Sequence, residues 1–169
     1  MEGVDVFIGS QEHAPYPIEP DRWSEYVTFD LWPLRPVLTL RPSLGDRETV
    51  LSVPLDVPPG ARLVTSIGVK PVLWDKLPPS WVRFAIAIRS GAEREILFER
   101  TIDPSNVVAD RRWFPVDVDL GDFAGRTVHV EFSTSTQRER AETVFMGGWG
   151  MPRILSTGDP GRNTDPPPA

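Results

Sequence analysis

Six tryptophans in 169 residues are the side chains best suited to ligand contact in this sequence. The flat face of an indole ring complements the C–H face of a sugar, and the indole N–H adds one hydrogen-bond donor. Trp74, Trp81 and Trp149 lie in or beside segments rich in proline or glycine, where a loop would present the rings to a ligand. The alternative for each ring is a place at the end of a hydrophobic core.

Charged residues come directly before a further tryptophan, Trp113. A guanidinium from Arg111 or Arg112 can stack on that ring, and Asp110 can pair with either arginine. A binding interpretation places Asp110 and Arg112 on a sugar hydroxyl, whereas a structural interpretation makes the segment a corner with a surface ion pair. The candidate ligand-binding residues are therefore Trp74, Trp81, Trp149, Asp110 and Arg112.

Two carboxylates lie at a spacing that would permit catalysis. Asp117 and Asp119 lie two residues apart on one expected strand, so their side chains are about 6–7 Å apart. That spacing overlaps the range of about 6.5–9.5 Å found in inverting glycosidases, but nothing nearby marks either carboxyl for a raised pKa. The sequence also has no G-x-S-x-G elbow, phosphate loop or dinucleotide glycine pattern. We expect no catalytic residues and a protein that is not an enzyme.

The sequence contains few residues of the types that bind transition metals. The two histidines, His13 and His129, are far apart in the sequence and there is no cysteine, which argues against zinc. His129 lies beside Glu131 on a strand, where a metal or acid–base role is one interpretation and a solvated strand residue is the expected one. We expect no cofactor, although oxygen-rich loops such as residues 103–106 suit a structural calcium ion.

The elements that must position these residues are short strands, seen most clearly in residues 110–132. Apolar side chains occupy every second position in residues 116–120 and again in residues 128–132, which indicates two strands that each bury one face. Residues 121–125 form the corner between them, and Gly125 suits the positive φ that a tight corner needs.

The same alternation recurs along residues 49–57, 61–72 and 82–89. In residues 49–57, Pro54 removes a backbone donor and predicts an edge strand or a bulge. Nineteen prolines and thirteen glycines separate the segments, and helical periodicity is almost absent. The sequence predicts an all-β fold, an antiparallel β-sandwich of eight to ten strands, with jelly-roll as the leading topology.

The chain divides into three expected parts. Residues 1–30 form an N-terminal extended segment with a short edge strand around residues 4–8, and residues 31–155 form the β-sandwich domain. Residues 147–150, Gly-Gly-Trp-Gly, are interpreted as a glycine-rich kink that gives the backbone freedom around a buried or half-buried ring. Residues 156–169 are too polar and proline-rich to pack, which predicts a disordered tail.

Three segments carry a resemblance to a known family: VRFAIAIRSGAEREILFERTIDP, RRWFPVDVDLGDFAGRTVHVEFSTST and GGWGMPRI. Their order over residues 84–154 resembles galactose-binding-like jelly-roll domains of bacterial cell-envelope proteins, which are relatives of carbohydrate-binding modules. The resemblance implies the fold, a non-catalytic role and an extracytoplasmic location. Domains of this kind bind sugars, bind other proteins or buttress a neighbouring domain.

Charge and length limit the partners. A net charge of −6 and a pI of about 4.9 argue against nucleic acid, and no apolar run is long enough to span a membrane. The N-terminus lacks the pattern of a signal peptide, which predicts a cytoplasmic protein or a piece of a larger one. The functional prediction is a binding module for a glycan or cell-envelope carbohydrate. The alternative is a structural or protein-interaction domain of a larger assembly with no small-molecule ligand.

Overall fold

The computed structural model describes residues 6–7, 24–40, 48–75, 81–136 and 147–156. From residue 157 on, the predicted tail lies outside the described residues, as does most of the predicted N-terminal segment. The described part contains ten strands: β1 (Val6–Phe7), β2 (Ser24–Thr28), β3 (Pro36–Leu40), β4 (Thr49–Asp56), β5 (Arg62–Val69), β6 (Val82–Ser90), β7 (Glu93–Ile102), β8 (Phe114–Asp119), β9 (Thr127–Ser135) and β10 (Gly147–Leu155). Three short 3-10 turns connect some of them: η1 (Pro71–Leu73), η2 (Val108–Asp110) and η3 (Gly121–Phe123).

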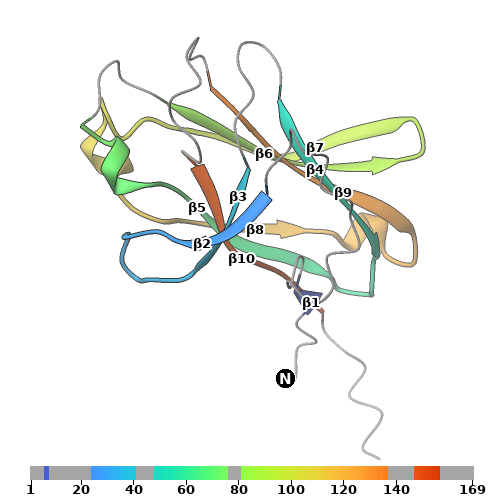
Figure 1. The fold of residues 1–169 in the computed structure, drawn as a ribbon. Helices are drawn as coiled ribbons and strands as arrows, with labels where there is room; N and C mark the ends of the chain where they lie inside the picture. Colours follow the sequence, from blue (N-terminus) through green and yellow to red (C-terminus); the bar gives the residue numbers. More distant parts are fainter. Residues whose placement is uncertain (1–5, 8–23, 41–47, 76–80, 137–146, 157–169) are drawn as a thin grey trace, which may run out of the picture.

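The strands form two antiparallel sheets that face each other (Figure 1). Sheet I has the order β2-β3-β10-β5-β8, with β1 also paired to β10, and sheet II has the order β4-β9-β6-β7. Four antiparallel pairs, β3/β10, β4/β9, β5/β8 and β6/β7, nest inside one another like a single long hairpin. Two further pairs join these nested pairs into sheets: β10/β5 within sheet I and β9/β6 within sheet II. This is the jelly-roll arrangement, and it confirms the predicted fold class.

The predicted apolar faces meet in one core between the sheets. Phe84, Ile86, Val118 and Val130 belong to a single buried cluster, as the alternation requires. The ring of Trp149 lies in the same cluster, edge-on to Phe84 and Phe132 with centroids 5.2 Å away in both cases. β4, which contains Pro54, is an edge strand of sheet II, so that prediction is also confirmed.

The Gly-Gly-Trp-Gly segment differs from its prediction. Gly125, at the corner before β9, has a positive φ of 76° as expected, but the glycines at 147, 148 and 150 do not have positive φ values. They lie in the regular part of β10, and the bulge of that strand falls between Gly150 and Arg153. The segment is glycine-rich because neighbouring side chains fill the space beside the backbone, not because the chain needs unusual angles.

Gly148 gives a direct test of this packing. An added Cβ would lie 2.1 Å from Cγ1 of Val37 and 2.9 Å from Cζ of Phe29. Overpacking of this kind costs about 1–3 kcal/mol, so Gly148→Ala should lower the free energy of unfolding by about 2–3 kcal/mol in urea denaturation. Gly91→Ala is the control, since Gly91 has a φ of 61° but an added Cβ would meet nothing within 4 Å. It should lose only about 1 kcal/mol, from backbone strain; equal losses would contradict the packing explanation.

Candidate functional site

The connection between β2 and β3, residues 29–35, is fastened to sheet I by Trp113. The indole Nε1 of Trp113 donates a hydrogen bond of 3.1 Å to the carbonyl of Leu31, and the ring stacks on Phe29 at 5.8 Å with an interplanar angle of 16°. Gly68 leaves room for this ring, because a Cβ there would lie 2.8 Å from Cε3 of Trp113. A second small core cluster, formed by Phe29, Leu31, Val37 and Trp113, therefore lies beside the main core.

Trp74 links the connection from β5 to β6 with the connection from β7 to β8. Its Nε1 donates to the carbonyl of Val69 at 3.0 Å, and its half-buried ring packs against both core clusters. The Arg111 guanidinium lies 5.6 Å from the centroid of that ring and forms an ion pair of 2.8 Å with Asp75. The segment around η1 is thereby joined to the end of η2.

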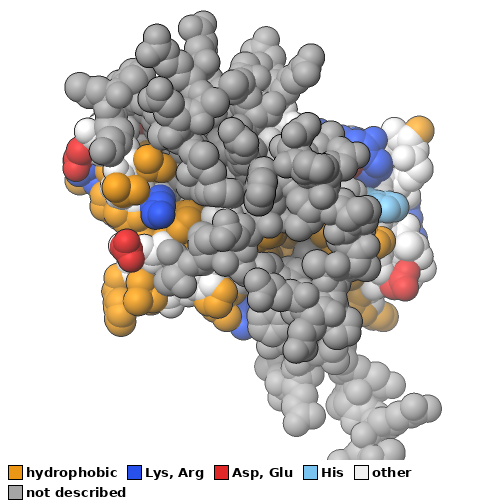
Figure 2. Space-filling model, in the orientation of Figure 1, with side chains coloured by type: hydrophobic (Ala, Val, Ile, Leu, Met, Phe, Trp, Pro, Cys, Tyr) orange, Lys and Arg blue, Asp and Glu red, His pale blue; other side chains and the backbone are white. Residues whose placement is uncertain are grey.

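Exposed apolar side chains gather on the three connections held in this way. Of the six large hydrophobic residues that are exposed in the described part of the chain, five lie here: Trp32, Leu34, Val72, Val107 and Val108. Trp32 has the greatest exposure, at 82%. We call these five residues the loop-end surface. The connections that carry them lie at the left end of the sandwich in Figure 1, and Figure 2 shows hydrophobic side chains gathered at the same end.

The tryptophans predicted as ligand contacts have different surroundings. Trp74 borders the loop-end surface, and Trp81 is half-buried just before β6, where its carbonyl accepts a hydrogen bond of 2.8 Å from Thr136 Oγ1. Trp149 is completely buried in the core, so its ring is not accessible to a ligand. Its prediction as a surface contact is wrong because β10 is a central strand of sheet I and not a loop.

Asp110 and Arg112 do not form the surface ion pair that the structural interpretation allows, and their contact with a sugar hydroxyl stays a prediction. Asp110 Oδ2 accepts a hydrogen bond of 2.8 Å from the backbone N–H of Asp103. Arg112 is exposed, and its guanidinium lies 4.7 Å from the ring centroid of Phe114. Among the described residues, no ion pair links Arg112 to Asp110.

The guanidinium that stacks on Trp113 belongs to Arg35 and not to Arg111 or Arg112. Its Cζ lies 5.1 Å from the centroid of the Trp113 ring, and its Nη1 donates to Ser66 Oγ at 2.8 Å. Sequence reasoning missed both Arg35 and Trp32. The available signal was the run Leu31-Trp32-Pro33-Leu34, which places apolar side chains in a connection between two strands.

The carboxylates considered for catalysis have structural partners. Asp117 accepts a hydrogen bond of 2.9 Å from Arg62 Nε and is also 2.8 Å from Arg62 Nη2. Asp119 Oδ1 accepts from the backbone N–H of Gly121 at 2.8 Å at the start of η3. Each carboxylate is therefore explained by the local fold.

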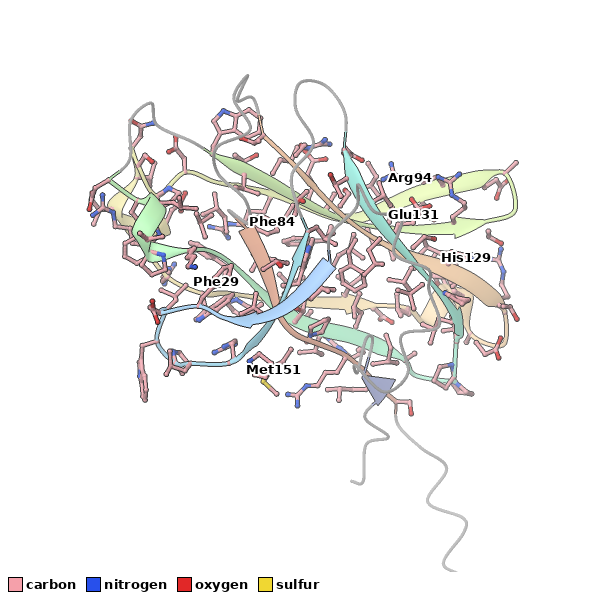
Figure 3. The ribbon with its side chains drawn as sticks, in the orientation of Figure 1. Phe29, Phe84, Arg94, His129, Glu131 and Met151 are labelled. Carbon is pink, nitrogen blue, oxygen red and sulfur yellow. The ribbon has the colours of Figure 1, made fainter. Side chains whose placement is uncertain are left out.

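Glu131 lies at the centre of an ion-pair network on the outer face of sheet II. Its buried carboxylate accepts hydrogen bonds from Arg89 Nε at 2.6 Å and Arg94 Nε at 2.7 Å. Glu48 is 3.3 Å from Arg94 and 2.8 Å from Arg83, which also pairs with Glu99. Figure 3 shows Arg94 and Glu131 on neighbouring parts of this sheet. His129, on the same strand as Glu131, is exposed.

The surroundings of Glu131 change its ionisation. Burial acts to raise the pKa of the Glu131 carboxyl, but the hydrogen bonds and charges of Arg89 and Arg94 outweigh burial and hold that pKa below its ordinary value. A group with a lowered pKa in the folded state contributes stability that is complete above its unfolded pKa, about 4.3 for glutamate. That contribution is lost as the pH falls through the folded pKa.

Wild-type protein should therefore lose more unfolding free energy than Glu131→Gln when the pH is lowered from about 7 to about 3.5. The variant should already be less stable at pH 7, because Arg89 loses its charged partner and Arg94 keeps only Glu48. Urea denaturation at the two pH values measures both effects. The control is Asp122→Asn at an exposed position, which should keep the wild-type loss. An unchanged pH dependence in Glu131→Gln would show that the network does not set acid stability.

No group of three or more histidine, aspartate or glutamate side chains is arranged to hold a metal ion within the described ranges. In the loop proposed for calcium, both Asp103 carboxylate oxygens accept hydrogen bonds from Asn106. Calcium binding there stays a prediction. Among the described residues, no helix has the length and apolar character needed to cross a membrane.

Comparison with known sequences identifies no family. No family model matches the chain. A protein of Archaeoglobus fulgidus described as uncharacterized is 32% identical over 109 residues, which make up 64% of this chain and 28% of that protein. This chain therefore spans little more than a quarter of the length of that relative.

Two solved structures that are similar to the chain contain carbohydrate-binding modules. One holds the CBM22-1 and GH10 modules of Clostridium thermocellum endo-1,4-beta-D-xylanase 10B with xylohexaose: TM-score 0.49, 8% identity, 82% of this chain and 25% of that one. The other is a carbohydrate-binding module of Cellvibrio mixtus lichenase 5A with cellotriose: TM-score 0.39, 11% identity, 83% of this chain and 92% of that one. At these scores the jelly-roll assignment rests on the strand pairing described above.

Proposed function

We propose that the protein is a non-catalytic binding module that recognises a glycan at the loop-end surface. The observation that carries this proposal is the exposure of Trp32, a residue that is 82% accessible to solvent. Large aromatic side chains that a fold needs only for its core are buried, as Trp149 is in this protein. Cell-envelope carbohydrate is the narrower ligand class that we expect.

The position of Trp32 supports a role as a stacking platform. The neighbouring residue Leu31 is held by the hydrogen bond from Trp113 and by burial in the second core cluster. A ring on a connection fixed in this way binds at a lower entropic cost than a ring on a freely moving loop. The C–H face of a pyranose would cover its apolar face and exclude water.

Polar groups at the same end suit the hydroxyl groups of a sugar. Asp75 is exposed and already accepts a hydrogen bond from Arg111, and the exposed Arg112 carries further donors. Binding sites of this kind combine an apolar platform with a few polar groups that fix the ligand's orientation. Of the three tryptophans predicted as ligand contacts, Trp74 and Trp81 are half-buried, so part of each residue is accessible to a ligand.

A second function has its own supporting observation. Four of the five residues of the loop-end surface, Leu34, Val72, Val107 and Val108, are aliphatic and offer no flat ring to a sugar. Clustered exposed apolar residues are also typical of contacts between domains. This favours the alternative in which the sandwich packs against another part of a larger protein, and the greater length of the Archaeoglobus fulgidus relative is compatible with it.

A glycan array followed by calorimetry with the best oligosaccharide tests the first function. Trp32→Ala should weaken binding by at least about tenfold, which corresponds to about 1.4 kcal/mol. Folding should be unchanged, because Trp32 is highly exposed to solvent.

Ile96→Ala is the matched control, since Ile96 is the one exposed large hydrophobic residue of the described chain that lies outside the loop-end surface. It should bind the oligosaccharide like the wild-type protein. Binding that survives Trp32→Ala, or an array on which no glycan binds, would contradict the proposal and leave the domain-contact function in its place.

A further inference from the structure

Two exposed arginines stack on the same phenylalanine at the open edge of the sandwich. The Cζ atom of Arg100, on β7, lies 3.8 Å from the ring centroid of Phe114, and the Cζ atom of Arg112 lies 4.7 Å from the same centroid. β7 is the edge strand of sheet II and β8, which begins at Phe114, is the edge strand of sheet I. Arg100 therefore comes from sheet II and Arg112 from the connection just before β8, and both guanidinium groups lie near one ring.

Most other arginines of the described chain have polar partners. Carboxylates pair with five of them: Arg62, Arg83, Arg89, Arg94 and Arg111. Arg35 and Arg126 donate to the hydroxyl groups of Ser66 and Ser90. Among the described residues, neither Arg100 nor Arg112 has a carboxylate or hydroxyl partner. Each side chain instead places its guanidinium against an aromatic ring, which leaves its N–H groups for another acceptor.

The two centroid distances set an upper limit on the separation of the guanidinium groups, and that limit lets both groups contact one anionic group. Because both Cζ atoms are measured from the same centroid, their separation cannot exceed the sum of 3.8 and 4.7 Å. A carboxylate or sulfate accepts two parallel N–H bonds from a guanidinium, and it has oxygens enough to bond two such groups. Like charges this close repel each other, and a bound anion would replace that repulsion by attraction.

These arginines flank the loop-end surface. Arg100 lies just before the connection from β7 to β8 and Arg112 lies near its end, and the same connection contributes Val107 and Val108. Arg112 also precedes Trp113, which is bonded to Leu31 beside Trp32. Trp32 and the two arginines therefore lie at the same end of the sandwich, where one oligosaccharide could contact all three.

We infer that Arg100 and Arg112 bind an anionic group of the ligand, so that the preferred glycan is acidic, with a uronate carboxylate or a sulfate ester as the anion. This inference rests on the proposed function, since it gives the charge of the glycan bound at that end. It also explains why an acidic protein, with a net charge of −6, keeps two arginines without carboxylate partners at one edge.

The test is calorimetry with three oligosaccharides of equal length: a neutral one, a uronate-containing one and a sulfated one. Wild-type protein should bind at least one acidic oligosaccharide about tenfold or more tighter than the neutral one. That preference should shrink when the salt concentration rises from about 10 mM to about 150 mM, because the Debye length shortens from about 30 Å to about 8 Å. The stronger of the two acidic oligosaccharides identifies the anion.

The double variant Arg100→Gln, Arg112→Gln should bind the acidic oligosaccharide no better than the neutral one and should lose the salt dependence. Arg126→Gln is the matched control, because Arg126 is also exposed and stacks at 5.6 Å on a phenylalanine, Phe123, beside η3. It should behave like the wild-type protein. Should the double glutamine variant unfold, Arg100→Lys, Arg112→Lys keeps the charge without the planar fork and should weaken acidic binding while retaining its salt dependence.

The outcomes separate the inference from the proposed function. Equal affinity for neutral and acidic oligosaccharides that is lost in Trp32→Ala would overturn the anion site and leave glycan binding intact. A preference for acidic oligosaccharides that survives the double glutamine variant would overturn the assignment to Arg100 and Arg112. Binding to none of the three oligosaccharides would overturn both.

Discussion

The contact between Trp113 and the connection from β2 to β3 determines the shape of the loop end. One hydrogen bond to the Leu31 carbonyl and one ring stack on Phe29 hold that connection against sheet I. A hydrogen bond contributes about 1 kcal/mol net and an aromatic pair about 0.5–1.5 kcal/mol beyond its burial. Together with the burial of Leu31, these contacts favour one conformation of the backbone next to Trp32.

The jelly-roll connectivity brings the remaining parts of the site to the same end. Because β5 pairs with β8 and β6 pairs with β7, the connections around η1 and η2 leave their strands at one end of the sandwich. Trp74 and Arg111 then join these two connections through a ring contact and the ion pair with Asp75. The result is an apolar surface whose edges carry arginine and carboxylate side chains, a combination typical of small-molecule binding sites.

On the outer face of sheet II, in contrast, arginine side chains form ion pairs with glutamates. There Arg83 and Arg89 pair with Glu48, Glu99 and Glu131. Arg100 and Arg112 differ because their nearest partner is an aromatic ring. The two sets of arginines cannot be told apart by residue type or by local sequence, since the difference lies in what the folded chain places beside them.

Alternation predicted the fold well because each strand needs only to bury every second side chain, which is a local property. Phe84, Val118 and Val130 are examples, and Gly125 and Pro54 show that local backbone preferences were equally informative. Whether an individual tryptophan is buried or exposed depends instead on residues that are distant in the sequence. Trp113 is held by a residue 82 positions away in the sequence, and Trp149 is buried by rings on two other strands. The same limit applies to ion pairs, because the partner of Arg111 is 36 positions away and is not the adjacent aspartate.

The most direct measurement of the central claim is a titration of ¹⁵N-labelled protein with the bound oligosaccharide, followed through the indole N–H signals. If the glycan lies on the loop-end surface, the Trp32 signal should shift most, the Trp74 signal less, and the signal of the buried Trp149 hardly at all. Shifts confined to backbone amides of β6, β7 and β9, with the Trp32 signal unchanged, would place the ligand on the outer face of sheet II and contradict the account.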